Sequence, residues 1–226
     1  MRINEIFYSL QGEGFLAGVP SVFVRLAGCP LRCRWCDTKY AWDKETGQDY
    51  GIEEIVQTVQ KWICNFVVIT GGEPMINPDL PRLVQELKAS GKHITIETAG
   101  IAFIQDLACD LMSISPKLSN STPDDAKLAA IHEDSRLDIA ILRELIDNYK
   151  YQLKFVVDSQ DDLSEIQQTI KEIGNVDSEK VMLMPQAATR DELLAKSLMV
   201  ADMCKRTGFA FCQRLQVLLW NNERGR

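Results

Sequence analysis

The sequence predicts an α/β protein built on a largely parallel β-sheet, and two observations support this fold class. Short runs rich in Val, Ile and Phe alternate with longer amphipathic segments along the 226 residues, an alternation typical of repeated βα units. Hydrophobic residues make up 46% of the chain and charged residues 25%, which is typical of a folded protein with a sizeable core. Because we find no internal repeat and no long linker, we expect a single domain over residues 1–226.

Eight segments have the length and composition of β-strands. Most are short apolar runs rich in β-branched and aromatic residues, which favour extended structure. The predicted strands are Arg2–Phe7, Ser21–Leu26, Phe66–Thr70, His93–Glu97, Leu111–Ser115, Gln152–Val157, Val181–Met184 and Leu215–Trp220. Ligands of parallel sheets bind beyond the carboxyl ends of the strands, so we expect functional residues to follow these segments.

Five segments between the strands predict helices. Ile52 and Ile55 begin a helical spacing of apolar residues, and Asn77 is an expected N-cap residue before a proline. The predicted helices are Ile52–Ile63, Pro78–Ala89, Leu137–Tyr149, Leu163–Ile173 and Glu192–Cys204. The polar segment Lys117–Asp134, in contrast, predicts a surface loop. The pattern leaves a closed barrel, an incomplete barrel and a doubly wound open sheet as alternatives.

Composition argues against several classes of function. The 25 Lys and Arg residues against 32 Asp and Glu residues give a net charge of −7, and no basic run is longer than a pair, so we expect no nucleic-acid partner. No stretch approaches the roughly 20 apolar residues that span a bilayer, and the N-terminus lacks a signal pattern. We therefore expect no membrane association and a cytoplasmic location. His93 and His132 stand apart from other ligand types and are expected to be packed or solvated.

The most informative pattern is a cluster of three cysteines. Cys29, Cys33 and Cys36 fall within eight residues directly after an apolar strand, so a tight loop can wrap three sulfurs around one inorganic centre. A closed zinc or electron-transfer site needs four protein ligands, whereas three leave one coordination position open. The alternative is a structural zinc site completed by a distant cysteine. The remaining cysteines, which we otherwise expect to be core thiols, are Cys64, Cys109, Cys204 and Cys212.

The spacing CxxxCxxC, with Trp35 before the last cysteine, resembles the cluster loop of radical S-adenosylmethionine enzymes, in which three cysteines hold a 4Fe-4S cluster. Other motifs follow in the order seen in one family of these enzymes, the 7-carboxy-7-deazaguanine synthases. The motifs are SLQGEG (Ser9–Gly14), FVRLAGCPLRCRWCDT (Phe23–Thr38), TGGEP (Thr70–Pro74), ETAG (Glu97–Gly100) and SPK (Ser115–Lys117). The combination is more specific than the cysteine spacing alone.

The resemblance implies an incomplete, modified TIM-like (βα) barrel of the radical S-adenosylmethionine type. It also implies a 4Fe-4S cluster, S-adenosylmethionine and Mg²⁺ as cofactors, a homodimer, and an electron donor such as flavodoxin or ferredoxin. The implied reaction is that of a lyase, which converts 6-carboxy-5,6,7,8-tetrahydropterin to 7-carboxy-7-deazaguanine and releases ammonia. The alternatives are an activase that makes a glycyl radical on a partner protein, and a non-catalytic iron–sulfur or zinc module.

Residues matching the family's motifs are expected to bind S-adenosylmethionine. Gly71 and Gly72 follow a strand and expose backbone to a ligand, and Glu73 can accept hydrogen bonds from a cationic amino group. Trp35 offers an aromatic face to the cluster and the adenosyl group. The full set is Trp35, Asp37, Gly71, Gly72, Glu73, Glu97, Ser113, Ser115, Pro116 and Lys117. Taken singly, each also has an ordinary explanation, such as a tight turn, a hydrophobic anchor or a solvated lysine.

A second set is expected to bind the pterin. Its guanidine-like face needs acceptors, and its carboxylate suits a bidentate cation. Arg25 lies in an otherwise apolar strand, where a buried arginine needs an anionic partner. The expected substrate residues are Leu10, Gln11, Gly12, Glu13, Arg25 and Thr70, and Thr38 is expected to bind Mg²⁺. The alternatives are a flexible hairpin at Ser9–Gly14 and a turn capped by Asp37 and Thr38.

The second half of the chain resembles the family less distinctly. Met184–Gln186 and the C-terminal segment are similar to it, but the family often has a histidine where Gln216 stands. The sequence therefore leaves substrate contacts from the C-terminus open.

Overall fold

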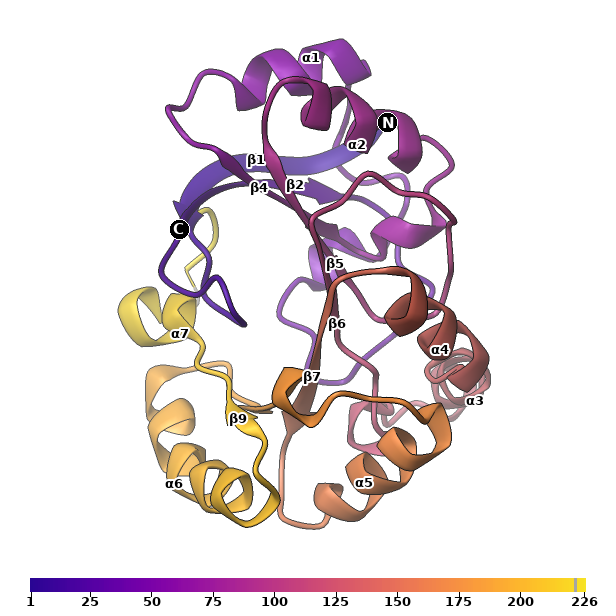
Figure 1. The fold of residues 1–226 in the computed structure, drawn as a ribbon, viewed down its shortest axis with the longest axis vertical. Coiled ribbons are helices and arrows are strands. Elements are labelled where there is room, and N and C mark those ends of the chain that lie inside the picture. The colour runs from indigo at the N-terminus through magenta and orange to yellow at the C-terminus, as the bar shows by residue number, and fades with distance from the viewer. Residues whose placement is uncertain (222) are drawn as a thin grey trace.

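The strands of the computed structural model, which describes residues 1–221 and 223–226, form one nine-stranded sheet in the order β3-β1-β2-β4-β5-β6-β7-β8-β9 (Figure 1). From β2 to β9 all neighbours are parallel, whereas β1 is antiparallel to both β2 and β3. The strands are β1 Arg2–Leu10, β2 Pro20–Leu26, β3 Gln48–Asp49, β4 Phe66–Gly71, β5 His93–Thr98, β6 Leu111–Ile114, β7 Tyr151–Val157, β8 Val181–Pro185 and β9 Ala210–Phe211.

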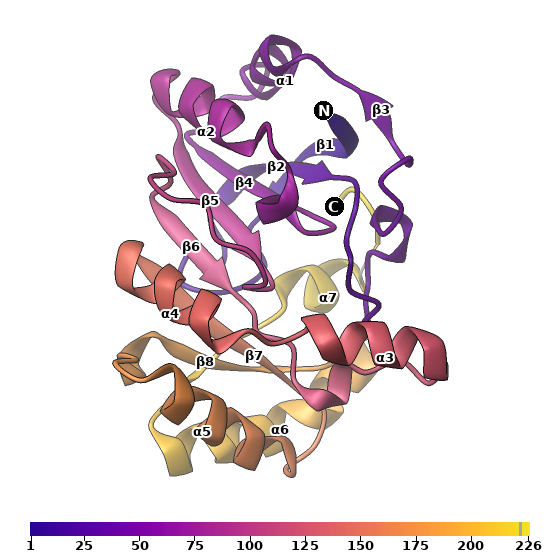
Figure 2. The same ribbon diagram turned by 90° about the vertical axis from the view of Figure 1, so that its right-hand side faces the viewer.

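The helices lie outside the curved sheet, and the sheet does not close. The helices are α1 Ile52–Val59, α2 Leu80–Ala89, α3 Ala126–Ser135, α4 Ile139–Asn148, α5 Asp162–Ile173, α6 Arg190–Thr207 and α7 Leu215–Trp220. Short 3₁₀ turns occur at Lys39–Ala41, Pro74–Ile76, Ser119–Ser121 and Ser178–Lys180. Figures 1 and 2 show α1, α2, α4, α5 and α6 around the outer face of the sheet, with β1 and β9 separated by an opening beside α7. The predicted incomplete barrel is thereby confirmed.

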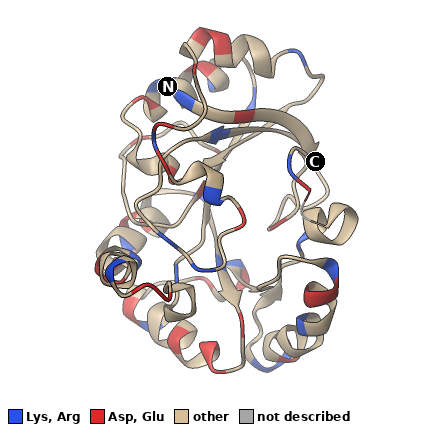
Figure 3. Cartoon of the chain, turned by 180° about the vertical axis from the view of Figure 1, so that it is seen from behind, with Lys and Arg blue, Asp and Glu red and all other residues tan. Residues whose placement is uncertain are grey.

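The main core lies between the sheet and its outer helices. Strands β4 to β8 are almost wholly buried, which explains why their sequences are nearly continuous apolar runs. Local signals fix the helix ends: Thr189 and Glu192 form a capping box at the start of α6, and Gly208 in a left-handed conformation ends it. Charged residues of both signs are interspersed over the outer helices (Figure 3). Among the described residues no helix is long and apolar enough to cross a membrane.

Two predictions about elements are wrong. The first seven predicted strands and all five predicted helices are present, with shifted ends, but Leu215–Trp220 forms the helix α7 instead of a strand. Of its six residues only Val217 is fully buried, against Leu193 and Ala187. The predicted loop Lys117–Asp134 contains a 3₁₀ turn and most of α3, because the Asp125 side chain accepts hydrogen bonds from the N–H groups of Lys127 and Leu128, the second and third residues of this helix.

Candidate active site

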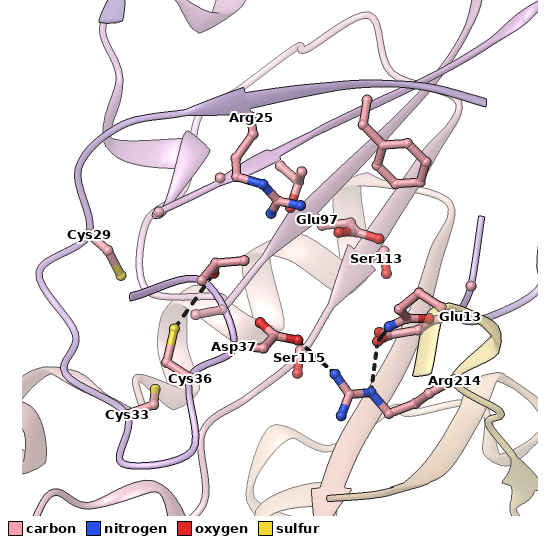
Figure 4. A pocket seen from close by; sticks show the side chains of 18 of the residues that line it. Glu13, Arg25, Cys29, Cys33, Cys36, Asp37, Glu97, Ser113, Ser115 and Arg214 are labelled. Atoms are coloured by element: carbon pink, nitrogen blue, oxygen red, sulfur yellow. Dashed lines mark hydrogen bonds and ion pairs between the residues drawn. The ribbon is translucent and has the colours of Figure 1, made fainter. Parts of the chain in front are cut away.

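One cavity of about 290 Å³ opens at the carboxyl ends of the strands and collects nearly all the predicted site residues. Glu73 and Pro116 are the two predicted residues that do not line it. Figure 4 shows the three thiols on one side of this cavity and Glu13 and Arg214 on the opposite side. The motifs, although spread over the first half of the chain, therefore converge on one place, as expected for residues that follow neighbouring parallel strands.

The cluster loop, residues Cys29 to Cys36, is closed at its base by backbone hydrogen bonds. Gly28 N–H donates to the Ala41 carbonyl over 2.9 Å, and Cys29 N–H donates to the Trp42 carbonyl over 3.0 Å. Burial raises the pKa of the Cys29 thiol to about 12 and that of Cys33 to about 11. Without a bound metal these thiols are neutral at pH 7, whereas a metal ion would hold them as thiolates.

Three thiols in this arrangement suit an iron–sulfur cluster. Each thiolate of such a cluster binds a different iron, whereas a single zinc ion holds all its sulfurs about 2.3 Å from one point. Within residues 1–221 and 223–226, no three Cys, His, Asp or Glu side chains are arranged around one such point. Cys29, Cys33 and Cys36 all line one cavity, and three thiolates leave one iron of a cluster without a protein ligand, so the donor set fits the cluster that the motif implies.

The TGGEP turn packs against the start of the cluster loop and is hydrogen-bonded to the residues just before it. Gly72 N–H donates to the Leu26 carbonyl over 3.0 Å, and Glu73 N–H donates to the Gly28 carbonyl over 2.8 Å. A Cβ atom on Gly72 would lie 2.0 Å from the Gly28 oxygen and 2.8 Å from the Cys29 nitrogen, so only glycine allows this approach. The turn and the cluster loop are thus one packed unit.

Glu73 has a different environment from the one that the motif suggests. Its carboxylate is buried, and it accepts hydrogen bonds from Thr98 Oγ1 and Ala99 N, both over 2.7 Å, and from Met75 N over 3.0 Å. Burial raises its pKa. In this structure the side chain therefore joins β4 to β5, and the exposed backbone of Gly71 and Gly72 faces the cavity instead.

Polar groups from β5 and β6 line the middle of the cavity. Glu97 accepts a hydrogen bond from Gln11 Nε2 over 3.0 Å, and the Ser113 hydroxyl accepts one from Gln152 Nε2 over 2.8 Å. Lys117 Nζ donates to the Ser115 carbonyl over 2.5 Å and lies 5.8 Å from the centre of the Trp35 ring. The structure thus brings together Trp35, Ser115 and Lys117, which the sequence assigned to one ligand.

Arg25 has the carboxylate partner that its apolar strand requires. Its Nε donates to Glu5 Oε1 over 2.7 Å, and the hydroxyl of Tyr40 donates to the same oxygen over 2.5 Å. Arg224, from the C-terminal segment, donates to Glu5 Oε2 over 3.0 Å and lies 4.0 Å from the centre of the Tyr40 ring. Glu5 thus fixes one edge of the Arg25 guanidinium, whose side chain lines the cavity.

Glu13 is held by two buried cations. Lys154 Nζ donates to Glu13 Oε2 over 2.8 Å, while Arg214 Nε and Gln216 Nε2 donate to Oε1 over 3.3 and 2.8 Å. Arg214 also donates to Asp37 over 2.7 Å. Burial by itself raises the pKa of Glu13, but the charges of Lys154 and Arg214 outweigh it and lower this pKa to about 2. Glu13 is therefore a carboxylate at neutral pH.

Sequence analysis missed Lys154, Arg214 and Glu5. Lys154 lies in the fully buried strand YQLKFVV, so the argument applied to Arg25 applies to it as well. Arg214 has no comparable signal, because it lies in a short connection before α7.

The other four cysteines are buried or half-buried, as expected. Cys212 accepts a hydrogen bond from Gly14 N–H over 3.2 Å.

Comparison with known proteins agrees with this site. The model of the Radical SAM superfamily matches residues 24–136. The 7-carboxy-7-deazaguanine synthase of Halobacterium salinarum is 42% identical over 98% of this chain and 91% of its own length, and that of Rhodopirellula baltica is 42% identical over 100% and 88%. The crystal structure of QueE from Escherichia coli superposes with a TM-score of 0.68 at 26% identity, covering 93% of this chain and 92% of that one. Similarity to these synthases over nearly the full length does not favour the glycyl-radical activase or the binding-module alternative. The chain belongs to the 7-carboxy-7-deazaguanine synthase family of radical S-adenosylmethionine enzymes.

Proposed function

We propose that this chain converts 6-carboxy-5,6,7,8-tetrahydropterin to 7-carboxy-7-deazaguanine with release of ammonia. It is a lyase that uses a 4Fe-4S cluster and S-adenosylmethionine, as its family does. The observation that carries the proposal is that one cavity joins three cluster-type thiols to Arg25 and Glu13. The thiols suit the cofactor, and Arg25 and Glu13 suit the opposite ends of a carboxypterin.

Arg25 and Glu13 recognise the substrate by charge. Glu5 holds the Nε edge of Arg25, which leaves the terminal nitrogens of the guanidinium for a bidentate bond to the substrate carboxylate. Glu13, ionised because of Lys154 and Arg214, accepts hydrogen bonds from the N–H groups of the pterin ring. Gln11 and the backbone of Leu10 and Gly12 complete this end of the cavity, and Thr70 lies beside Arg25 in the paired strand.

Cys29, Cys33 and Cys36 hold the cluster, and the groups around the middle of the cavity hold S-adenosylmethionine. When bound, this cofactor pair supplies a carbon radical that can remove a hydrogen atom from the substrate. Exposed backbone at Gly71 and Gly72 accepts hydrogen bonds from the cofactor's amino group, with Glu73 keeping the turn rigid. Trp35 excludes water with its ring. The remaining proposed contacts are Asp37, Glu97, Ser113, Ser115, Pro116 and Lys117.

Several finer assignments belong to the same proposal. The Thr38 hydroxyl lines the cavity 3.6 Å from Cys36 Sγ and supplies an oxygen ligand for Mg²⁺, which favours such ligands together with substrate oxygens and water. A flavodoxin or ferredoxin provides electrons, and two copies of the chain form a homodimer. The described cysteines are free thiols, which supports a reducing compartment such as the cytoplasm.

The test is anaerobic reconstitution with iron, sulfide, reductant, Mg²⁺, S-adenosylmethionine and the carboxytetrahydropterin, followed by mass spectrometry. We expect the deazapurine product only when both S-adenosylmethionine and the carboxytetrahydropterin are present. Cys33→Ala is expected to lose cluster iron and turnover, whereas Cys109→Ala, which changes a thiol remote from the cavity, keeps both. A fully loaded and active Cys33→Ala variant, or a loaded wild-type protein without product, would contradict the proposal.

A further inference from the structure

His132 is a fully buried histidine that the proposed reaction does not use. It lies on α3, in the segment that the sequence predicted to be a surface loop, and its side chain is 0% exposed. The backbone N–H of Arg32 donates to its Nδ1 over 3.2 Å, and its Nε2 lies 2.8 Å from the Ser121 hydroxyl. Arg32 stands between Cys29 and Cys33, so this histidine contacts the cluster loop directly.

The hydrogen-bond partners define the protonation state of the ring. The Ser121 hydroxyl donates to the Leu118 carbonyl over 2.6 Å, so its oxygen accepts from Nε2–H of His132. The Arg32 N–H is a donor, so Nδ1 accepts. Both contacts are satisfied by one neutral tautomer, and burial lowers the pKa of His132, which favours that neutral form.

The same segment contacts the cluster loop at two further places. Arg34 N–H donates to the Ser121 carbonyl over 2.9 Å, and Trp35 Nε1 donates to the Asn120 carbonyl over 3.1 Å. Together with the bond from Arg32, three neighbouring residues of the loop are attached to Asn120, Ser121 and His132. Figure 2 shows α3 directly beside the loop that follows β2.

The segment is itself fixed to the barrel. Asn120 Nδ2 donates to the Val156 carbonyl over 3.0 Å and to Asp162 over 2.9 Å. Arg136, at the end of α3, donates to the Lys117 carbonyl over 2.8 Å and to Glu165 over 3.0 Å. The contacts to the loop are therefore made from an element that β7 and α5 hold in place.

We propose that residues 119–135 form a clamp on the cluster loop and that His132 is its positioning residue. Nδ1 of His132 accepts the backbone N–H of Arg32, which lies between Cys29 and Cys33, and thereby holds these two cysteines at the spacing that the cluster needs. An apolar side chain of the same size would fill the space but leave the Arg32 N–H buried without a partner. This inference rests on the proposed function only in assuming that the three cysteines bind a cluster.

Two amide variants separate the clamp from simple packing. Oδ1 of His132→Asn takes the place of Nδ1 and keeps the acceptor for Arg32, whereas His132→Gln places its amide near Ser121 and loses that acceptor. We expect the reconstituted His132→Gln protein to lose iron to a chelator about tenfold faster than wild type, the effect of removing one hydrogen bond of ordinary strength. His132→Asn is expected to stay within about twofold of wild type.

The matched control is His93→Asn, which removes the other histidine of the chain. His93 is the first residue of β5, at the end of the strand away from the cavity, so this variant is expected to leave iron release unchanged. Backbone hydrogen exchange at Arg32 gives a second readout, in which protection is lost in His132→Gln and kept in His132→Asn. Equal iron release by the Asn and Gln variants, or iron release that follows only their thermal stabilities, would overturn the clamp. Because neither readout uses pterin turnover, a failure of the clamp is distinguishable from a failure of the proposed reaction.

Discussion

At the scale of single residues, the chemistry of the cavity depends on how its buried charges are neutralised. Glu13 and Lys154 lie 2.8 Å apart, and the side chain of Lys154 is only 4% exposed. Each charge would be costly to bury alone, but together with Arg214 they form a network in which every charge faces an opposite one. The network keeps Glu13 in the form that accepts hydrogen bonds.

The depressed pKa of Glu13 predicts a pH dependence of stability. The pKa is about 2 in the folded chain against 4.5 for an unperturbed glutamate, so the unfolded chain binds the proton first as the pH falls. The stabilisation is complete above pH 4.5 and is lost as the pH falls from 4.5 towards 2. We expect the difference in unfolding free energy between wild type and Glu13→Gln to shrink by on the order of 3 kcal/mol across this window. Urea unfolding of the apoprotein at several pH values measures it, and a pH-independent difference would contradict this assignment.

The residues that sequence analysis identified and missed differ in one physical respect. Those it identified lie in short motifs that follow strand ends. Lys154 and Arg214 act on Glu13 from 141 and 201 residues away, and nothing in a single sequence indicates such a pairing. Lys154 at least carried a local signal, since a charge within an apolar strand requires a partner, whereas Arg214 did not.

At the scale of elements, the site depends on the close packing of the turn after β4 under the cluster loop. Gly72 approaches Gly28 and Cys29 so closely that no side chain fits between them. Two backbone hydrogen bonds, from Gly72 and Glu73, join the two segments. The position of Cys29 is therefore set by a strand end that is remote from it in sequence.

This packing predicts the effect of one methyl group. Gly72→Ala would place Cβ 2.0 Å from the Gly28 oxygen, so the turn and the cluster loop must separate. We expect a loss of about 1–3 kcal/mol or more in unfolding free energy together with reduced iron content after reconstitution. Gly51→Ala is the control, because its Cβ would meet no atom closer than 3.8 Å. Normal iron content in Gly72→Ala would show that the close approach is not needed.

The elements also show where prediction from pattern ends. Strands β4 to β8 are recognisable because burial on both faces makes them continuous apolar runs. The same criterion misassigned Leu215–Trp220, because a short apolar run is ambiguous between strand and helix; the structure leaves Leu218 and Leu219 exposed, 39% and 47%. Helix α3 was missed because its polar sequence lacks an apolar stripe, and its only fully buried residue is His132.

At the scale of the whole molecule, the two ends of the open sheet are joined by polar contacts between connecting segments instead of by paired strands. We call this contact region, between residues 11–15 and residues 212–217, the seam. The chain after β1 meets the chain before α7, where Leu215 N–H donates to the Gly12 carbonyl over 3.0 Å. Arg214 also lies at the seam and binds three partners: Glu13 after β1, Asp37 after the cluster loop, and the Ala187 carbonyl after β8. One buried side chain thus joins both ends of the sheet to the segment next to the cluster ligands.

Removing this arginine is expected to open the seam without unfolding the barrel. Arg214→Met leaves Glu13 with Lys154 and leaves Asp37, 34% exposed, to water, so we expect a loss of about 3 kcal/mol, at the lower end for a broken buried pair. Hydrogen exchange should quicken at residues 11–15 and 212–217 but not in α1 or α2. Arg143→Met, which removes an arginine bound to the last carbonyls of α5, is the control and should leave the seam unchanged. Exchange at the seam equal to wild type in Arg214→Met would show that backbone contacts alone close the barrel.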